Sequence, residues 1–192
     1  MVYLLQREQH LVDIQIEAKM KIGFTGTMSV GKTTLVKALS KLEQFKDYTC
    51  TTERSKYLNS LGIPLNHDTT IEGQTIFLSE RVTELMQDKL ITDRTILDVM
   101  AFTNTAKKVS HIDGDAFEEY SKRFINQYDY IFYISPKGVE IEDNGIRETN
   151  TEYRDKIDNE ISKLLTKYRP LYTVLEGTTD ERIKQILKTI HF

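Results

Sequence analysis

The sequence predicts an α/β protein, a three-layer sandwich in which helices cover both faces of a parallel sheet of about five strands. Short β-prone apolar segments alternate along the chain with longer segments of helical periodicity. Such alternation is typical of parallel sheets. The clearest strand, residues 130–134, reads Tyr-Ile-Phe-Tyr-Ile and is apolar throughout, as expected of a strand that is buried on both faces.

The expected elements follow this alternation from residue 20 onward. The predicted strands cover residues 20–25, 48–52, 89–92, 130–134 and 171–175. The predicted helices cover residues 32–42, 53–61, 69–90, 95–108, 117–128, 153–168 and 180–190. Thr69 with Glu72, and Thr178 with Glu181, have the spacing of a capping box and indicate two helix starts.

Length and composition indicate one domain and exclude several kinds of protein. The 192 residues carry a formal net charge of −3, so nucleic acid stays open as a partner but is not favoured. Cys50 is the single cysteine, which excludes an internal disulfide and a cysteine-based zinc site and fits a reducing cytosol. No apolar run reaches membrane-spanning length. We therefore expect a cytoplasmic protein with no membrane partner.

The first 19 residues do not fit the alternating pattern. They mix apolar residues with charges and have no signal-peptide layout. We expect residues 1–19 to be an N-terminal extension of uncertain role and residues 20–192 to form the domain.

Residues 26–33 carry the most specific motif. They read Gly-Thr-Met-Ser-Val-Gly-Lys-Thr, a G-x-x-x-x-G-K-T phosphate-binding loop between an expected strand and an expected helix. In such loops the backbone N–H groups surround the phosphates of a nucleotide, the lysine reaches the terminal phosphates and the final hydroxyl ligates Mg²⁺. The motif predicts a P-loop NTPase sandwich that binds ATP and Mg²⁺. The expected nucleotide contacts are Gly26, Ser29, Val30, Gly31, Lys32, Thr33 and Thr34.

Two carboxylates follow expected strands and are candidates for phosphoryl-transfer chemistry. Ligands bind at the carboxyl ends of parallel strands, where Glu53 and Asp93 are expected. Each could instead complement a helix dipole. Asp93 has the stronger claim because it ends an apolar strand. It would either polarise the acceptor hydroxyl or hold magnesium through water, and the sequence does not separate these roles.

A short lid is expected at residues 144–154, because a transfer enzyme must keep water from the reacting phosphate. This polar segment carries Arg147 and Arg154, whose spacing would place both guanidinium groups on one helix face. The alternative is a solvated loop whose arginines pair with Glu148 and Glu152.

Other polar residues give weaker signals. Gln74 could bind a base or amide through its carboxamide, although an exposed helix glutamine has the same appearance. No cluster of histidines suggests a metal site. Four basic residues are interpreted as ordinary solvated charges: Arg81, Lys89, Lys107 and Lys108.

Taken in order, the motifs resemble those of the ribosylnicotinamide-kinase domain of NadR-type proteins, an AAA/ATPase-like domain. The motifs are the phosphate loop, Thr-Thr-Glu-Arg at 51–54, Asp-Arg-Thr-Ile-Leu-Asp at 93–98, Asp-Asn-Gly-Ile-Arg at 143–147 and Tyr-Arg at 153–154. The similarity spans roughly residues 20–190 and extends to thymidylate-kinase-like and deoxynucleoside-kinase-like enzymes.

This resemblance implies roles for several residues. Asp93 would lie at the acceptor or magnesium site, and Arg147 and Arg154 would touch phosphates. Glu53 or Arg54 would face the acceptor, and we expect Arg94 and Gln74 to help bind it. Small kinases of this kind often form homodimers, so a homodimer stays open.

The expected function is therefore an ATP- and Mg²⁺-dependent kinase. Its acceptor would be a nucleoside, a nucleoside monophosphate or a similar small molecule. One alternative is a P-loop ATPase that acts as a regulatory or binding module without a phosphoryl acceptor. Another is a polynucleotide 5′-hydroxyl kinase. A GTPase is not expected, because neither D-x-x-G nor N-K-x-D occurs in the sequence.

Overall fold

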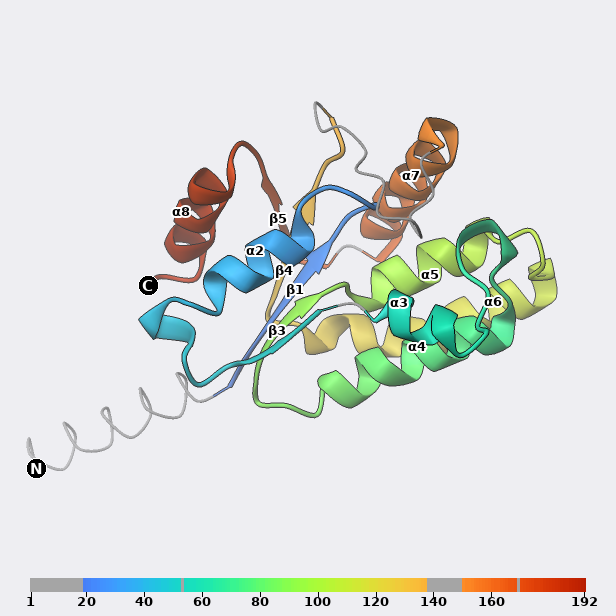
Figure 1. The fold of residues 1–192 in the computed structure, drawn as a ribbon, viewed down its shortest axis with the longest axis horizontal. Helices are drawn as coiled ribbons and strands as arrows, with labels where there is room; N and C mark the ends of the chain where they lie inside the picture. Colours follow the sequence, from blue (N-terminus) through green and yellow to red (C-terminus); the bar gives the residue numbers. More distant parts are fainter. Residues whose placement is uncertain (1–18, 53, 138–149, 169) are drawn as a thin grey trace, which may run out of the picture.

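A computed structural model describes residues 19–52, 54–137, 150–168 and 170–192 (Figure 1). Three expectations from the sequence lie outside these residues. They are the extension at 1–19, apart from its last residue, the carboxylate of Glu53, and the part of the lid that contains Arg147.

Over the described residues the sheet has five strands, all parallel, in the order β2-β3-β1-β4-β5. This confirms the predicted α/β fold class. The strands are β1 (Met20–Thr25), β2 (Thr49–Thr51), β3 (Lys89–Asp93), β4 (Tyr130–Ile134) and β5 (Tyr172–Leu175). Phe24 of β1 is in register with Asp93 of β3 and with Phe132 of β4. The carboxyl ends of these three strands therefore lie together.

The described part of the chain also contains seven α-helices and three short 3₁₀ helices, of which all but α8 lie between strands. The α-helices are α2 (Lys32–Leu39), α3 (Ser55–Ser60), α4 (Ile71–Glu84), α5 (Ile96–Thr105), α6 (His111–Ser121), α7 (Thr151–Tyr168) and α8 (Thr179–Thr189). The 3₁₀ helices are η1 (Glu43–Phe45), η2 (Asn66–Asp68) and η3 (Lys122–Gln127). α4 ends six residues before the predicted position 90, because the chain must turn before it enters β3 at Lys89.

Polar side chains at the N-cap set the starts of several helices. The predicted capping box of Thr178 and Glu181 is present at α8. The predicted box of Thr69 and Glu72 is wrong, because Thr70 is the N-cap of α4 and accepts a hydrogen bond from the N–H of Gly73. Thr69 lies one residue earlier, fully buried, and its hydroxyl accepts a hydrogen bond from Gln74 instead.

Two apolar layers enclose the sheet. α2 and α8 pack on one face, and α4, α5, α6 and α7 pack on the other (Figure 1). β4 shows the alternation, since Ile131 belongs to the second layer while Phe132 and Ile134 belong to the first. No helix among the described residues combines the length and apolar character that crossing a membrane requires.

Candidate functional site

The phosphate-binding loop follows β1 and depends on left-handed backbone at three positions. Gly26 has φ 146°, Ser29 has φ 59° and Gly31 has φ 88°. A Cβ on Gly26 would lie 2.5 Å from the carbonyl oxygen of Ile134, so only glycine allows β1 and β4 to approach here. The loop conformation therefore follows from the residue types of the motif.

The start of α2 differs from the starts of most longer helices. Side-chain hydroxyls of Thr70, Thr95, Ser110 and Thr178 cap α4, α5, α6 and α8. The N-cap of α2 is Gly31, which has no side chain to cap the helix, and the first turn of α2 contains no acidic residue. The N–H groups and the positive end of the dipole at this terminus suit an anion.

Lys32 is the first residue of α2 and is 5% exposed. Its ammonium group donates hydrogen bonds to the carbonyl oxygens of Gly26 and Thr27, at 2.5 and 2.7 Å. The cation is therefore held inside the loop, where it can face the phosphates of a bound nucleotide.

Thr33 and Asp93 meet at the adjoining ends of α2 and β3. The hydroxyl of Thr33 donates a hydrogen bond to Oδ2 of Asp93, which is 1% exposed. This hydroxyl and carboxylate are hard oxygen ligands of the kind that Mg²⁺ prefers. The described residues contain no group of three or more His, Cys, Asp or Glu side chains that could hold a metal. Magnesium usually keeps several waters and phosphate oxygens as ligands, so a site with few protein ligands fits it.

The turn after Asp93 is strained. Arg94 has φ 135°, which is uncommon for a residue with a side chain and is found preferentially at functional sites. Its guanidinium group lies 3.7 Å from Oδ1 of Asp98 and 5.0 Å from the ring centre of Phe102. Arg94 thus lies beside the candidate site, directed toward the first turn of α5.

Asp98 connects this turn to the phosphate loop, a role that the interpretation of the sequence did not assign. Asp98 is fully buried, and its Oδ1 accepts a hydrogen bond from the N–H of Gly26 at 3.3 Å. Oδ2 accepts from the N–H of Thr95 at 2.8 Å, which completes a capping box. The Thr95-x-x-Asp98 spacing was a signal in the sequence that could have located the helix start.

Arg154 lies in the first turns of α7 and is 5% exposed. Its backbone carbonyl accepts a hydrogen bond from the hydroxyl of Thr27, and its guanidinium donates to the carbonyl of Pro136 at 3.4 Å. Burial lowers the pKa of Arg154 from its usual value. The structure therefore brings Arg154 to the phosphate loop.

Two of the residues expected on the acceptor side are Arg54, the N-cap of α3, and Gln74 of α4. Gln74 is 4% exposed and donates a hydrogen bond to the hydroxyl of Thr69 at 2.7 Å, so it is not an exposed helix glutamine. Arg54 is half-exposed, pairs with Glu80 at 3.2 Å and lies over the ring of Tyr57.

Arg81 corrects one expectation, since it is not a solvated charge. It is 3% exposed and forms an ion pair with Glu84 at 2.6 Å. Burial raises the pKa of Glu84, while Arg81 and the hydroxyl of Thr92 oppose that shift. The position three residues after Leu78 places Arg81 on the apolar face of α4, a signal that could have revealed its burial.

A second residue that the sequence did not reveal is Arg182 of α8. Its guanidinium group donates a hydrogen bond to the carbonyl oxygen of Val30 in the phosphate loop at 2.8 Å. The two residues are 152 positions apart, so no local pattern could predict the contact.

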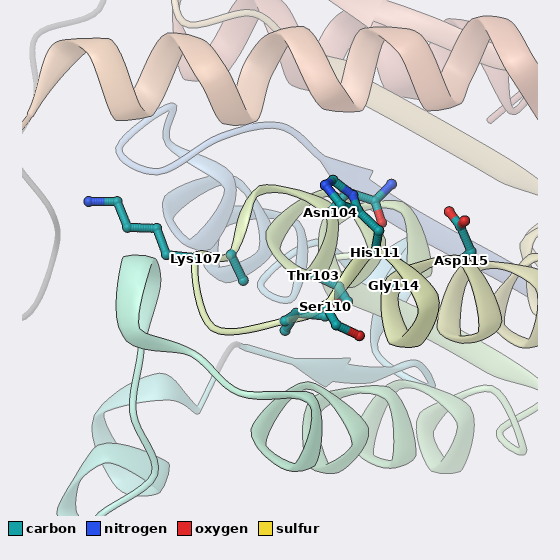
Figure 2. Close-up of a pocket in the computed structure, with 9 residues that line it drawn as sticks. Thr103, Asn104, Lys107, Ser110, His111, Gly114 and Asp115 are labelled. Carbon is teal, nitrogen blue, oxygen red and sulfur yellow. The ribbon is translucent and has the colours of Figure 1, made fainter.

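A separate cavity lies between the end of α5 and the start of α6 and has a volume of about 350 Å³ (Figure 2). Its lining is largely polar and includes Thr103, Asn104, Lys107, Ser110, His111 and Asp115. In Figure 2 the side chain of Lys107 extends away from the other labelled residues. Thr103 lies roughly 12 Å along α5 from Thr95, given 1.5 Å per helical residue. The cavity is therefore distinct from the phosphate loop.

The class of protein follows from this geometry and from one comparison. A P-loop domain is defined by a strand, a glycine-rich loop and a helix that begins where the loop ends. Here the loop also holds the ammonium group of Lys32. A family model described as an AAA domain (AAA_28) matches residues 21–182. The chain belongs to this AAA-domain family. A search of the curated proteins found no match to this sequence.

Solved structures share the fold at low sequence identity. A deoxyadenosine kinase from M. mycoides with bound dCTP has a TM-score of 0.60 and 19% identity, with 90% of this chain and 99% of that chain covered. A thymidylate kinase from Ehrlichia chaffeensis has a TM-score of 0.60 and 17% identity, with 90% and 99% covered.

A NadR protein in complex with NR has a TM-score of 0.68 and 16% identity. The match covers 91% of this chain and 51% of that one, so the chain spans about half the length of NadR. The fold is therefore P-loop kinase-like, and the resemblance to the NadR-type, deoxynucleoside-kinase-like and thymidylate-kinase-like group is confirmed.

Proposed function

We propose that this protein is an ATP- and Mg²⁺-dependent kinase that transfers the γ-phosphoryl group to a nucleoside, a nucleoside monophosphate or a similar small acceptor. The observation that carries the proposal is the hydrogen bond between Thr33 of the phosphate loop and Asp93 at the end of β3. It joins a nucleotide-binding loop to a buried carboxylate, on a fold shared with nucleoside and nucleotide kinases.

The donor half of the site would use the phosphate loop. Backbone N–H groups of the loop and of the α2 N-terminus would bind phosphate oxygens, and Lys32 would neutralise charge on the terminal phosphates. Thr33 and Asp93 would hold Mg²⁺, directly or through water. When bound, Mg²⁺ supplies charge neutralisation at the phosphates. Phosphoryl transfer needs mainly positioning and electrostatic stabilisation, which these residues would supply.

The transfer half of the proposed site would use Asp93 and two arginines. Asp93 would either hold Mg²⁺ through water or accept a hydrogen bond from an attacking hydroxyl, with Glu53 as the alternative base. Arg154 would contribute positive charge beside the loop, and Arg147 of the lid would act with it. Three residues are proposed to contact the acceptor: Arg54, Gln74 and Arg94.

A product screen tests this proposal. The protein is incubated with ATP and Mg²⁺ and with a panel of nucleosides, nucleoside monophosphates and DNA 5′ ends. ADP release and phosphorylated products are measured by mass spectrometry. We expect ADP release that depends on a small acceptor. Lys32→Ala should lower turnover by at least about 100-fold, as loss of a group that stabilises transition-state charge does.

Lys37→Ala is the matched control, because Lys37 lies on the same helix and is exposed. Its turnover should stay within about twofold of the unmodified protein, as for most surface substitutions. Full activity of Lys32→Ala would contradict the proposed site. ATP hydrolysis without any phosphorylated product would instead indicate a regulatory ATPase, and phosphorylation of DNA ends alone would indicate a polynucleotide kinase.

A further inference from the structure

Arg182 brings a positive charge from the last helix to the phosphate loop. Its Nη1 donates to the carbonyl oxygen of Val30 at 2.8 Å. The same atom would lie 3.2 Å from a Cβ built on Gly31. The guanidinium group is therefore packed against the two residues that precede Lys32.

The start of α8 is built so that Arg182 is held in place. The carboxylate of Glu181 is used by the capping box, in which it accepts hydrogen bonds from the N–H and hydroxyl of Thr178 at 2.7 and 2.8 Å. Gln185 exchanges two hydrogen bonds with the backbone of Glu176, at 2.9 and 3.2 Å. α8 also packs on α2 in one apolar layer. The arginine therefore projects from a rigid element.

The charge of Arg182 is not balanced by the described part of the chain. Among the described residues, no carboxylate lies within 4.0 Å of its guanidinium group. Its Nε is buried and has no hydrogen-bond partner among them. Burial lowers the pKa of Arg182. Arg182 is partly buried, so its uncompensated charge loses part of its hydration, and a polyanion in the adjoining loop would reduce that cost.

We propose that Arg182 is a positioning residue for the donor nucleotide, which holds the phosphate loop through the Val30 carbonyl and adds positive charge beside it. This inference rests on the proposed function, because it assumes that the loop binds a nucleoside triphosphate. The hydrogen bond would keep the N–H groups of Val30 and Gly31 directed at the phosphates. The effect of Arg182 therefore falls on donor affinity and not on the acceptor.

Direct binding of a fluorescent ATP analogue with Mg²⁺, measured without any acceptor, tests the inference. Arg182→Met should raise the Kd about tenfold, as expected for loss of a hydrogen bond from a charged group. Arg182→Lys keeps the charge and one donor but not the planar fork, and should recover a large part of the affinity. Arg123→Met is the control, because Arg123 is exposed on η3 over the ring of Tyr120. Its Kd should stay within about twofold.

Steady-state kinetics separate positioning from a general structural role. Arg182→Met should raise KM for ATP more than it lowers kcat, with KM for the acceptor unchanged. Thermal unfolding checks that each variant is folded. If the methionine variant does not fold, Arg182→Gln, which also removes the charge, carries the test with the same expected increase in Kd. An unchanged nucleotide Kd in the folded variant that lacks the charge, with tight binding by the unmodified protein, would overturn the role of Arg182 alone. Absence of ATP binding by the unmodified protein would overturn the proposed function and this inference together.

Discussion

Thr33 and Asp93 lie 60 positions apart in the chain and share one hydrogen bond in the fold. The contact exists because Thr33 is the second residue of α2, while Asp93 is the last residue of β3, the strand that neighbours β1. Two side chains that hold the same ion or orient the same hydroxyl act as one unit. Their substitutions should therefore not add.

A double-mutant cycle tests this unit. We expect Thr33→Ala and Asp93→Asn each to lower kcat/KM by roughly 100-fold or more, measured with the acceptor that the product screen identifies. The double variant should lose little beyond the larger single loss, because the second change removes a group whose partner is already absent.

The conservative variant Thr33→Ser keeps the hydroxyl and should retain most of the activity. Thermal unfolding of all four variants checks that the fold is intact. Losses that multiply in the double variant would show that the two side chains act independently.

Burial at the residue scale depends on partners as much as on residue type. Arg81 is buried because Glu84 neutralises it and Thr92 lies within 3.5 Å of it. Gln74 is buried because Thr69 accepts a hydrogen bond from its amide. Both residues looked like surface residues when only their polarity was considered.

At the scale of elements, a tyrosine joins β4 to α7, the helix that carries Arg154. The hydroxyl of Tyr133 donates a hydrogen bond to Oδ1 of Asp158 at 2.8 Å. Burial, with a further contribution from Asp158, raises the pKa of Tyr133 to about 12. This hydrogen bond anchors α7 at Asp158, about one helical turn after Arg154, whose carbonyl contacts the phosphate loop.

The raised pKa gives a prediction about alkaline stability. The folded state holds the phenol proton more tightly than the unfolded chain, so this contribution is present below pH 10 and is lost as pH rises toward 12. Tyr133→Phe should destabilise the protein by about 1 kcal/mol near pH 8, where the hydrogen bond is intact.

The stability difference between the unmodified protein and Tyr133→Phe should shrink as the pH rises above about 10. Urea unfolding at several pH values measures it. Tyr172→Phe, at a tyrosine that is 45% exposed, controls for removal of a phenol in general. A difference that stays constant up to pH 11 would contradict the prediction.

At the scale of the whole molecule, three distant helices converge on one loop. Asp98 of α5 binds Gly26, the backbone of Arg154 in α7 binds Thr27, and Arg182 of α8 binds Val30. β1 lies in the centre of the sheet, between β3 and β4, so elements from both halves of the chain reach its carboxyl end. A ligand at this loop should therefore stabilise the domain as a whole.

Thermal unfolding with Mg²⁺ and nucleotide measures this stabilisation. ATP at 100 times its Kd should add about 2.7 kcal/mol to the free energy of unfolding. For a chain of this size, that corresponds to a Tm increase on the order of 5–10 °C. Inorganic tripolyphosphate with Mg²⁺ should give a measurable part of this increase, because the contacts proposed here are made to phosphates. A full shift with ATP and none with tripolyphosphate would place the binding energy outside the phosphate loop.

Much of the fold could be predicted from local patterns. The alternation of apolar and amphipathic segments predicted a five-stranded parallel sheet, and the structure confirms it. The ends of helices were predicted less accurately, since α4 was expected to reach residue 90 and ends at Glu84. Helix periodicity can continue through a turn in the sequence, whereas the backbone hydrogen bonds stop where the chain must reverse.

The sequence by itself determined the phosphate loop, because glycines at positive φ and the neighbouring lysine and threonine are properties of adjacent residues. The tertiary structure alone decided which distant groups meet that loop. The contacts of Asp98, Arg154 and Arg182 depend on strand order and helix packing, which no short window of sequence contains. Burial likewise decided that Arg81 and Gln74 are interior residues, since desolvation and pairing depend on what surrounds a side chain in space.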